Sequence, residues 1–219
     1  MNPGVVAQLR DLMPDRPLTR IEALSIAERQ AQRFLELTGI ADGPVDDSLI
    51  CDLPRIEVRR TSPWPSSGAT QWIRGRWVIM LNASEPFVRQ RFSLAHEFKH
   101  IIDHQHIALI YRDLPAHQRH DFAEAVCNYF AGCLLMPRPW VKRAYAKTQR
   151  LDRLARHFHV SQAAMATRLS QIGLTDPAPR CTSLYSGDWL DAGADLAGSI
   201  TRYQRSTDHG PLIPELLTA

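Results

Sequence analysis

Three residues in the middle of the chain, His96, Glu97 and His100, have the HExxH spacing of a metal site. Residues four apart lie on the same face of a helix, so both histidines can present ring nitrogens to one metal ion. Glu97 is displaced from that point and can accept the proton of a water that attacks a carbonyl carbon. The pattern predicts a zinc-dependent hydrolase. The alternative is a pair of helix histidines that make ordinary hydrogen bonds.

A catalytic zinc needs a third protein ligand, and the sequence offers two candidates. His106 completes the spacing HExxHxxxxxH, but that pattern requires Gly at the position of Asp103, where the chain must turn sharply. Glu124 lies on a predicted helix at 117–135 and shares its polar face with Asn128. Glu124 is therefore the favoured ligand, and the alternative for it is a surface carboxylate paired with an arginine.

Three segments around these residues match, in order, the motifs of a known family. They are RQRFSLAHEFKH at 89–100, EAVCNYFA at 124–131 and LLMP at 134–137. In these segments the chain resembles the ImmA/IrrE family of metallo-endopeptidases, whose pattern reads RQRFTLAHELGH, then E-x-x-A/C-N-x-F-A and LLMP. The resemblance covers about residues 20–174.

The resemblance implies an endopeptidase with one zinc ion per chain, held by His96, His100 and Glu124, and with Glu97 as the catalytic base. It implies a protein substrate, a helix-turn-helix transcriptional repressor, whose cleavage relieves repression in a stress or mobile-element response. Lys99 replaces the Gly of many members, but its position points away from the metal, so activity is expected to persist. The competing class is a non-enzymatic regulator of the same fold that binds a repressor, a toxin partner or DNA.

The substrate peptide is expected to lie extended along a strand edge, near Gly68–Thr70 or Trp77–Asn82, through main-chain hydrogen bonds. The predicted substrate contacts are Gly68, Thr70, Asn128 and Tyr111. The group that stabilises the oxyanion stays open, and the candidates are Tyr111, His104 and His120.

Caps and apolar spacing predict the elements that position these residues. Thr19 and Glu22 form a capping box for a helix at 20–38, and Gly39 ends it. A strand is expected at 55–60, and a hairpin at 69–73 and 77–81 that turns at Arg74-Gly75. Further helices are expected from Pro86 to about His104 and at 117–135, 140–147, 151–157 and 161–172.

These elements predict an α+β fold. It consists of a zincin-like metallopeptidase core, with helices and a small, mostly antiparallel sheet, followed by a small helix-turn-helix-like subdomain. The expected division is a zinc metallopeptidase domain at 1–139, the helical subdomain at 140–175 and an irregular segment at 176–219.

The segment 138–171 is strongly basic, with eight Lys and Arg residues against Asp152. Part of it resembles half of a helix-turn-helix, in which Ser161, Gln162 and Arg168 could face DNA. Its apolar residues favour packing on the peptidase body instead, so direct nucleic-acid binding is disfavoured and no DNA-binding residue is assigned. These apolar residues are Leu151, Leu154, Phe158, Met165 and Leu169.

Composition narrows the class of protein further. Hydrophobic residues make up 44% and charged residues 22%, which excludes global disorder. The four cysteines lack a CxxC pair and favour a reducing compartment, and no apolar stretch is long enough for a membrane span. We therefore expect a cytoplasmic protein with no membrane association, in which Cys127 and Cys133 pack in the core without a neighbouring base.

Overall fold

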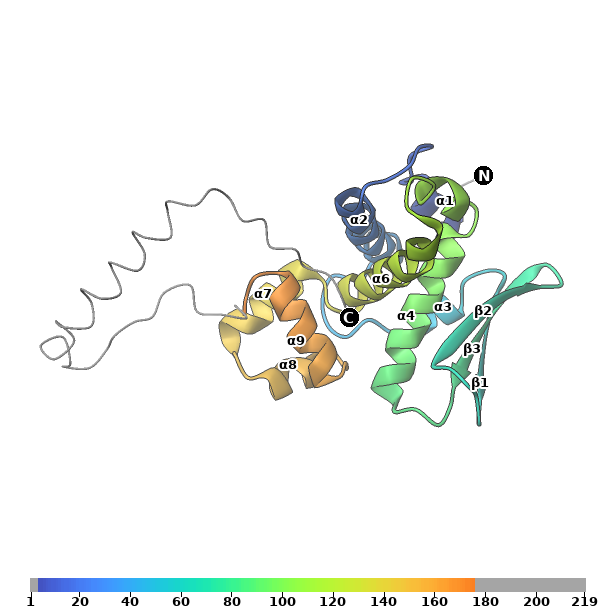
Figure 1. Ribbon diagram of the computed structural model, residues 1–219. Helices are drawn as coiled ribbons and strands as arrows, with labels where there is room; N and C mark the ends of the chain where they lie inside the picture. The colour runs from blue at the N-terminus through green and yellow to red at the C-terminus, as the bar shows by residue number, and fades with distance from the viewer. Residues whose placement is uncertain (1–3, 176–219) are drawn as a thin grey trace, which may run out of the picture. The chain divides into compact units, whose positions relative to one another are not determined.

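The computed structural model describes residues 4–175, in which a three-stranded sheet packs against a group of helices (Figure 1). Before the sheet lie α1 (Val5–Arg10), α2 (Arg20–Thr38) and α3 (Ser48–Cys51). The strands are β1 (Ile56–Thr61), β2 (Gly68–Ile73) and β3 (Arg76–Asn82). After them come α4 (Phe87–Asp103), α5 (Ile107–Ile110), α6 (Ala116–Leu135), α7 (Arg138–Lys147), α8 (Leu151–His157) and α9 (Gln162–Gln171).

The predicted α+β fold is confirmed, although the sequence patterns do not predict the short helices α1, α3 and α5. The predicted irregular segment 176–219 lies outside the described residues. Within residues 4–175, every helix is too short or too polar to span a bilayer.

Helix α2 begins and ends where its capping residues predict. The Glu22 amide donates to the Thr19 hydroxyl oxygen at 3.3 Å, and the Thr19 amide donates to the Glu22 carboxylate at 2.9 Å. At the other end Gly39 adopts a φ of 72°, a left-handed conformation that glycine reaches without strain. The predicted capping box and helix stop are therefore confirmed.

The sheet is mixed rather than mostly antiparallel. Its strand order is β1-β3-β2, with β3 parallel to β1 and antiparallel to β2. The predicted β2–β3 hairpin turns at Arg74 and Gly75, whose φ values of 49° and 81° match the right-handed twist of the strands. Because β3 is the central strand, Trp77–Asn82 has no free edge, and the prediction that a peptide could pair there is wrong. Among residues 4–175, strand β2 is an edge strand.

Helix α4, which carries the HExxH residues, lies between the sheet and the other long helices (Figure 1). It packs against β2 and β3 and also against α6, which packs in turn against α2. Phe98 of α4 contacts Phe34 of α2 and Phe130 of α6, with ring centroids 5.2 and 6.3 Å apart. All three rings are fully buried. The predicted metal-binding helix is therefore fixed in the core.

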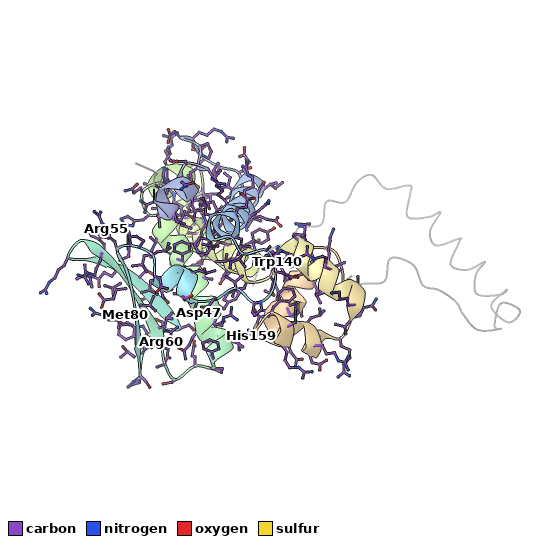
Figure 2. The ribbon with its side chains drawn as sticks, turned by 180° about the vertical axis from the view of Figure 1, so that it is seen from behind. Asp47, Arg55, Arg60, Met80, Trp140 and His159 are labelled. Atoms are coloured by element: carbon purple, nitrogen blue, oxygen red, sulfur yellow. The ribbon has the colours of Figure 1, made fainter. Side chains whose placement is uncertain are left out.

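Two buried arginines join α7–α9 to the rest of the described chain. Arg91 on α4 donates from Nε to Asp47 at 3.0 Å and from Nη1 to the His159 carbonyl oxygen at 3.0 Å. Asp47, beside α3, and His159, at the turn between α8 and α9, are both labelled in Figure 2. Arg168 on α9 donates to the Met136 carbonyl oxygen at 3.0 Å and has 1% of its surface exposed. Arg168 therefore cannot contact a DNA phosphate in this conformation.

Candidate metal centre

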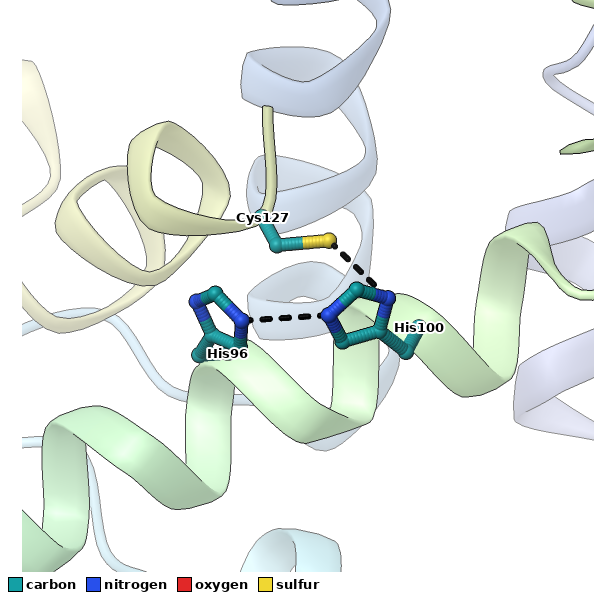
Figure 3. A group of neighbouring side chains, drawn as sticks. All are labelled: His96, His100 and Cys127. Atoms are coloured by element: carbon teal, nitrogen blue, oxygen red, sulfur yellow. Dashed lines mark hydrogen bonds between the residues drawn. The ribbon is translucent and has the colours of Figure 1, made fainter. Parts of the chain in front are cut away.

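Two neighbouring turns of α4 and one turn of α6 bring the predicted metal ligands together. The Nε2 atoms of His96 and His100 are 3.1 Å apart (Figure 3). Glu124 on α6 faces both: its carboxylate oxygens lie 3.1 Å from His96 Nε2 and 3.2 Å from His100 Nε2. Glu124 is paired with neither Arg91 nor Arg119, since Arg91 bonds to Asp47 and Arg119 to backbone carbonyls. Two imidazole nitrogens and a carboxylate therefore converge on one point.

This donor set fits a zinc ion. Zinc–nitrogen and zinc–oxygen bonds of about 2.0–2.1 Å in a tetrahedral site place ligand atoms about 3.3 Å from one another. The distances among the three groups, 3.1–3.2 Å, are close to that value. Imidazole and carboxylate ligands also leave the fourth position of a tetrahedron to solvent or substrate, which is the arrangement of catalytic sites.

The other ring nitrogen of each histidine has a partner on α6. His96 Nδ1 lies 2.9 Å from Asn128 Oδ1, an atom that can only accept, so Nδ1 carries the proton and donates it. That tautomer leaves the Nε2 lone pair directed at the centre. His100 Nδ1 lies 3.6 Å from Cys127 Sγ (Figure 3). Asn128, predicted as a substrate contact, is thus placed to orient His96.

Cys127 is a second candidate for the third ligand. Its Sγ and the nitrogens of His96 and His100 lie within 4.8 Å of one another. However, Sγ contacts Nδ1 of His100, whereas the Nε2 atoms of both histidines face each other and Glu124. Burial also raises the pKa of the Cys127 thiol well above its ordinary value, which favours the neutral S–H. The geometry therefore favours Glu124. The expectation that no basic side chain neighbours Cys127 is wrong, because the His100 ring lies beside it. With its Nε2 lone pair directed at the centre, however, the neutral ring carries its proton on Nδ1, so it donates to Sγ and does not activate the thiol.

His100 is also held in the protonation state that a metal ligand needs. Burial, and next the neighbouring His96, lowers its pKa below the ordinary value for histidine. The ring is therefore neutral at neutral pH, with a lone pair available for coordination.

The strand β2 fixes the carboxylate of Glu97. Thr70 donates from Oγ1 to Glu97 Oε2 at 2.6 Å, and Glu97 is 7% exposed. Gly68 lies so close that a Cβ at this position would stand 2.9 Å from Glu97 Oε1 and 3.0 Å from its Cγ. A side chain at position 68 would therefore displace the carboxylate. Gly68 and Thr70, predicted as substrate contacts, are both placed to position the predicted base.

Solvent reaches the centre through two adjoining cavities. One, of about 580 Å³, is lined by Glu97, His100 and Glu124 together with His104 and His120. The other, of about 240 Å³, is lined by Glu97 and Glu124 together with Arg89, Phe92 and Asn128. Of the oxyanion candidates, His104 and His120 thus line the cavity that contains Glu97 and His100.

Two residues singled out by the sequence lie elsewhere. The structure contradicts the prediction for Tyr111, because its ring is 2% exposed and packs edge-on against Phe122 in the core, with centroids 5.2 Å apart. His106, the alternative third ligand, precedes α5 and does not belong to the group of metal-ligand atoms that converge within residues 4–175.

Lys99 and Asp103 form an ion pair with each other. Lys99 stands where many family members have Gly, and Asp103 stands where the HExxHxxxxxH pattern requires Gly. Both are buried, at 1% and 2% exposure, and the Lys99 ammonium donates to the Asp103 carboxylate one turn along α4. Lys99 also donates to Gln30 Oε1 on α2 at 2.8 Å. Its charge is therefore directed into the core, away from the centre, where it cannot contact a substrate.

Comparison with known proteins identifies a family to which the chain is similar. The peptidase family described as the IrrE N-terminal-like domain matches residues 51–170. A solved structure of a Mycobacterium tuberculosis transcriptional regulator shares the fold, with 22% sequence identity and a TM-score of 0.57. The alignment covers 81% of this chain and 54% of that one, so the chain spans about half the length of the regulator. Comparison with curated proteins gave no match.

Proposed function

Because the chain belongs to the IrrE N-terminal-like peptidase family, we propose that it is a zinc-dependent endopeptidase that cleaves a protein substrate. In this proposal His96, His100 and Glu124 hold one zinc ion per chain. The observation that carries it is the convergence of the two Nε2 atoms and the Glu124 carboxylate at 3.1–3.2 Å, beside a separately positioned Glu97.

Glu97 is the general base of the proposed reaction. A bound zinc ion would polarise the scissile carbonyl group and acidify the attacking water. Glu97 accepts the proton of that water and later delivers it to the leaving amine. The hydrogen bond from Thr70 to Oε2 and the close approach of Gly68 hold the carboxylate in one place, so it need not reorganise during the reaction. A protein that only binds a partner needs no carboxylate fixed in this way, which disfavours the non-enzymatic regulator.

His120 is the best-placed group to stabilise the oxyanion. It lies four residues before Glu124 on α6, hence on the same side of that helix, and it lines the cavity that contains Glu97. His104 lines the same cavity, but its ring packs edge-on against Trp77 with centroids 4.8 Å apart. That contact commits His104 to the wall of the cleft and leaves His120 to donate to the oxyanion.

The proposed substrate is a helix-turn-helix transcriptional repressor, cleaved in the cytoplasm to relieve repression in a stress or mobile-element response. The family and the regulator that shares the fold both support a role in the control of transcription. A role in direct DNA binding is disfavoured because Arg168 is buried and because Arg150 and Arg156 are both paired with Asp152.

Incubation with a candidate repressor tests the proposal. The zinc-loaded protein is mixed with a helix-turn-helix repressor from the same genome, and the fragments are identified by mass spectrometry. We expect cleavage at one peptide bond, loss of cleavage on zinc chelation and recovery on zinc addition. Cleavage that is unaffected by chelation would contradict the proposal. The proposal would also be contradicted if the zinc-loaded protein cleaved neither the repressor nor a mixture of denatured proteins offered as a general substrate.

A further inference from the structure

Three aromatic rings form an exposed surface beside the candidate metal centre. Trp72 on β2 and Trp77 on β3 are direct cross-strand partners, with ring centroids 5.1 Å apart at an interplanar angle of 64°. Trp77 packs in the same edge-on manner against His104, at the end of α4, with centroids 4.8 Å apart. We refer to these three residues as the aromatic shelf. Trp72 is 47% exposed, so the shelf is open to solvent at its outer ring.

The aromatic shelf continues the line of residues that position Glu97. Alternate residues of a strand face the same side, so Gly68, Thr70 and Trp72 share one face of β2. Gly68 and Thr70 contact Glu97. Trp72 is the next residue on that face, about 7 Å beyond Thr70 at the usual rise of a strand.

The cavities also connect the aromatic shelf to the centre. Trp77 and His104 line the cavity of about 580 Å³ that contains Glu97 and His100. The same two residues line a second hollow of about 510 Å³, together with Trp72 and Ile56. A peptide that occupies the first cavity can therefore extend a side chain into the second.

The edge of β2 indicates the direction of such a peptide. Within the described residues β2 pairs only with β3, so its other edge is available to an added strand. Antiparallel pairing is the commoner and slightly more stable arrangement. An antiparallel peptide runs opposite to β2, so the residues before the cleaved bond lie toward Trp72 and those after it toward Gly68.

We propose that the aromatic shelf is a specificity subsite that binds a large apolar side chain, preferably aromatic, two to three residues before the cleaved bond. Aromatic rings favour edge-on partners, and Trp72 and Trp77 offer such a partner where an aliphatic chain would gain only burial. This inference rests on the proposed endopeptidase function and adds the class of substrate residue to it.

A peptide library tests the subsite first. Peptides from a proteome digest are incubated with the zinc-loaded protein, and cleavage sites are read by mass spectrometry. We expect enrichment of Phe, Tyr and Trp at the second or third residue before the cleaved bond. Two peptides that differ only by Phe or Ala at the enriched position then give a selectivity ratio, kcat/KM for Phe over kcat/KM for Ala.

The variant Trp72→Ala should lower that selectivity ratio roughly ten- to hundredfold, the range expected for loss of contact with a large apolar side chain. Trp72→Phe should restore most of it. The matched control is Ile73→Ala, on the same strand and also exposed, but on the opposite face, and its ratio should equal that of the wild type. A general loss of stability would lower the rates on both peptides without changing the ratio.

Binding to the Glu97→Gln variant separates this inference from the proposed function. If the wild type cleaves peptides but the library shows no aromatic preference, or Trp72→Ala leaves the selectivity ratio unchanged, the inference is overturned and the function stands. If the wild type cleaves nothing, the library peptides retained by Glu97→Gln are identified instead, and one of them that contains Phe is compared with its Phe-to-Ala version. Tighter binding of the Phe version, lost when Trp72→Ala is added, means that the function fails while recognition of an aromatic side chain by the shelf stands. Equal binding of both peptides overturns the inference.

Discussion

The buried pair of Lys99 and Asp103 supports a quantitative prediction about stability. Their side chains are 1% and 3% exposed, so neither charge has water to replace a lost partner. Lys99→Met leaves the Asp103 carboxylate buried without its cation and should lower the free energy of unfolding by about 3–5 kcal/mol. For a chain of this size that corresponds to a fall in Tm of about 6–20 °C.

The double variant Lys99→Met with Asp103→Leu removes both charges and should recover most of that loss. Apolar replacement of a buried ion pair is often neutral or stabilising, so we expect a double-mutant coupling energy of at least about 2 kcal/mol. The free energies are measured by urea unfolding monitored by circular dichroism, at equal zinc content for all variants.

The exposed pair of Arg156 and Asp152 provides the matched control. It has the same spacing along a helix, but its side chains are 74% and 34% exposed. Arg156→Met should therefore lower the free energy of unfolding far less than Lys99→Met does, because water and salt screen an exposed pair. If Lys99→Met costs no more than Arg156→Met, or if the two core substitutions are additive, the reasoning about the buried pair is refuted.

Four further variants test the centre and the stability of the fold. Gly68→Ala places a Cβ against the base and should lower kcat at least about tenfold at unchanged zinc content, measured with a fluorogenic peptide. Glu124→Ala should lose zinc in elemental analysis and Cys127→Ala should keep it, and the reverse result would make Cys127 the third ligand. The pKa of Glu28 is lowered: burial raises it, but hydrogen bonds from Arg138 and Tyr129 and the charges of Arg138 and Arg168 outweigh burial. Its contribution to stability is therefore present above the ordinary pKa of glutamate and is lost as the pH falls through the lowered value. Urea midpoints should accordingly fall less between pH 7 and pH 3.5 in Glu28→Gln than in the wild type.

The parts of this protein that follow local rules could be predicted from the sequence. The spacing of His96 and His100 places their rings on one face of a helix in any context, and the structure has both on one face of α4. The capping box of α2 and the turn at Arg74-Gly75 depend only on neighbouring residues, and both are present.

The features that depend on contacts between distant segments could not be predicted. The parallel pairing of β1 with β3 depends on how 14 residues between β1 and β3 fold back. The reason for Gly68 is the carboxylate of Glu97, 29 residues further along the chain, which no local pattern reveals. The hydroxyl group of Tyr111 suggests a substrate contact or an oxyanion donor. Its ring instead packs against Phe122 of α6 in the core, a contact that depends on where α6 lies and not on the sequence around Tyr111. In the sequence, Lys99 and Asp103 are two unrelated replacements of Gly. Only the structure shows that the two side chains form an ion pair in the core.

The role of Glu97 is tested most directly by one comparison of cleavage rates. The variant Glu97→Gln keeps the shape of the side chain and can still accept the hydrogen bond from Thr70, but it cannot take a proton at neutral pH. At equal zinc content its rate on a peptide that the wild type cleaves should be roughly 100- to 10,000-fold lower. Cleavage by Glu97→Gln at the rate of the wild type would contradict the account.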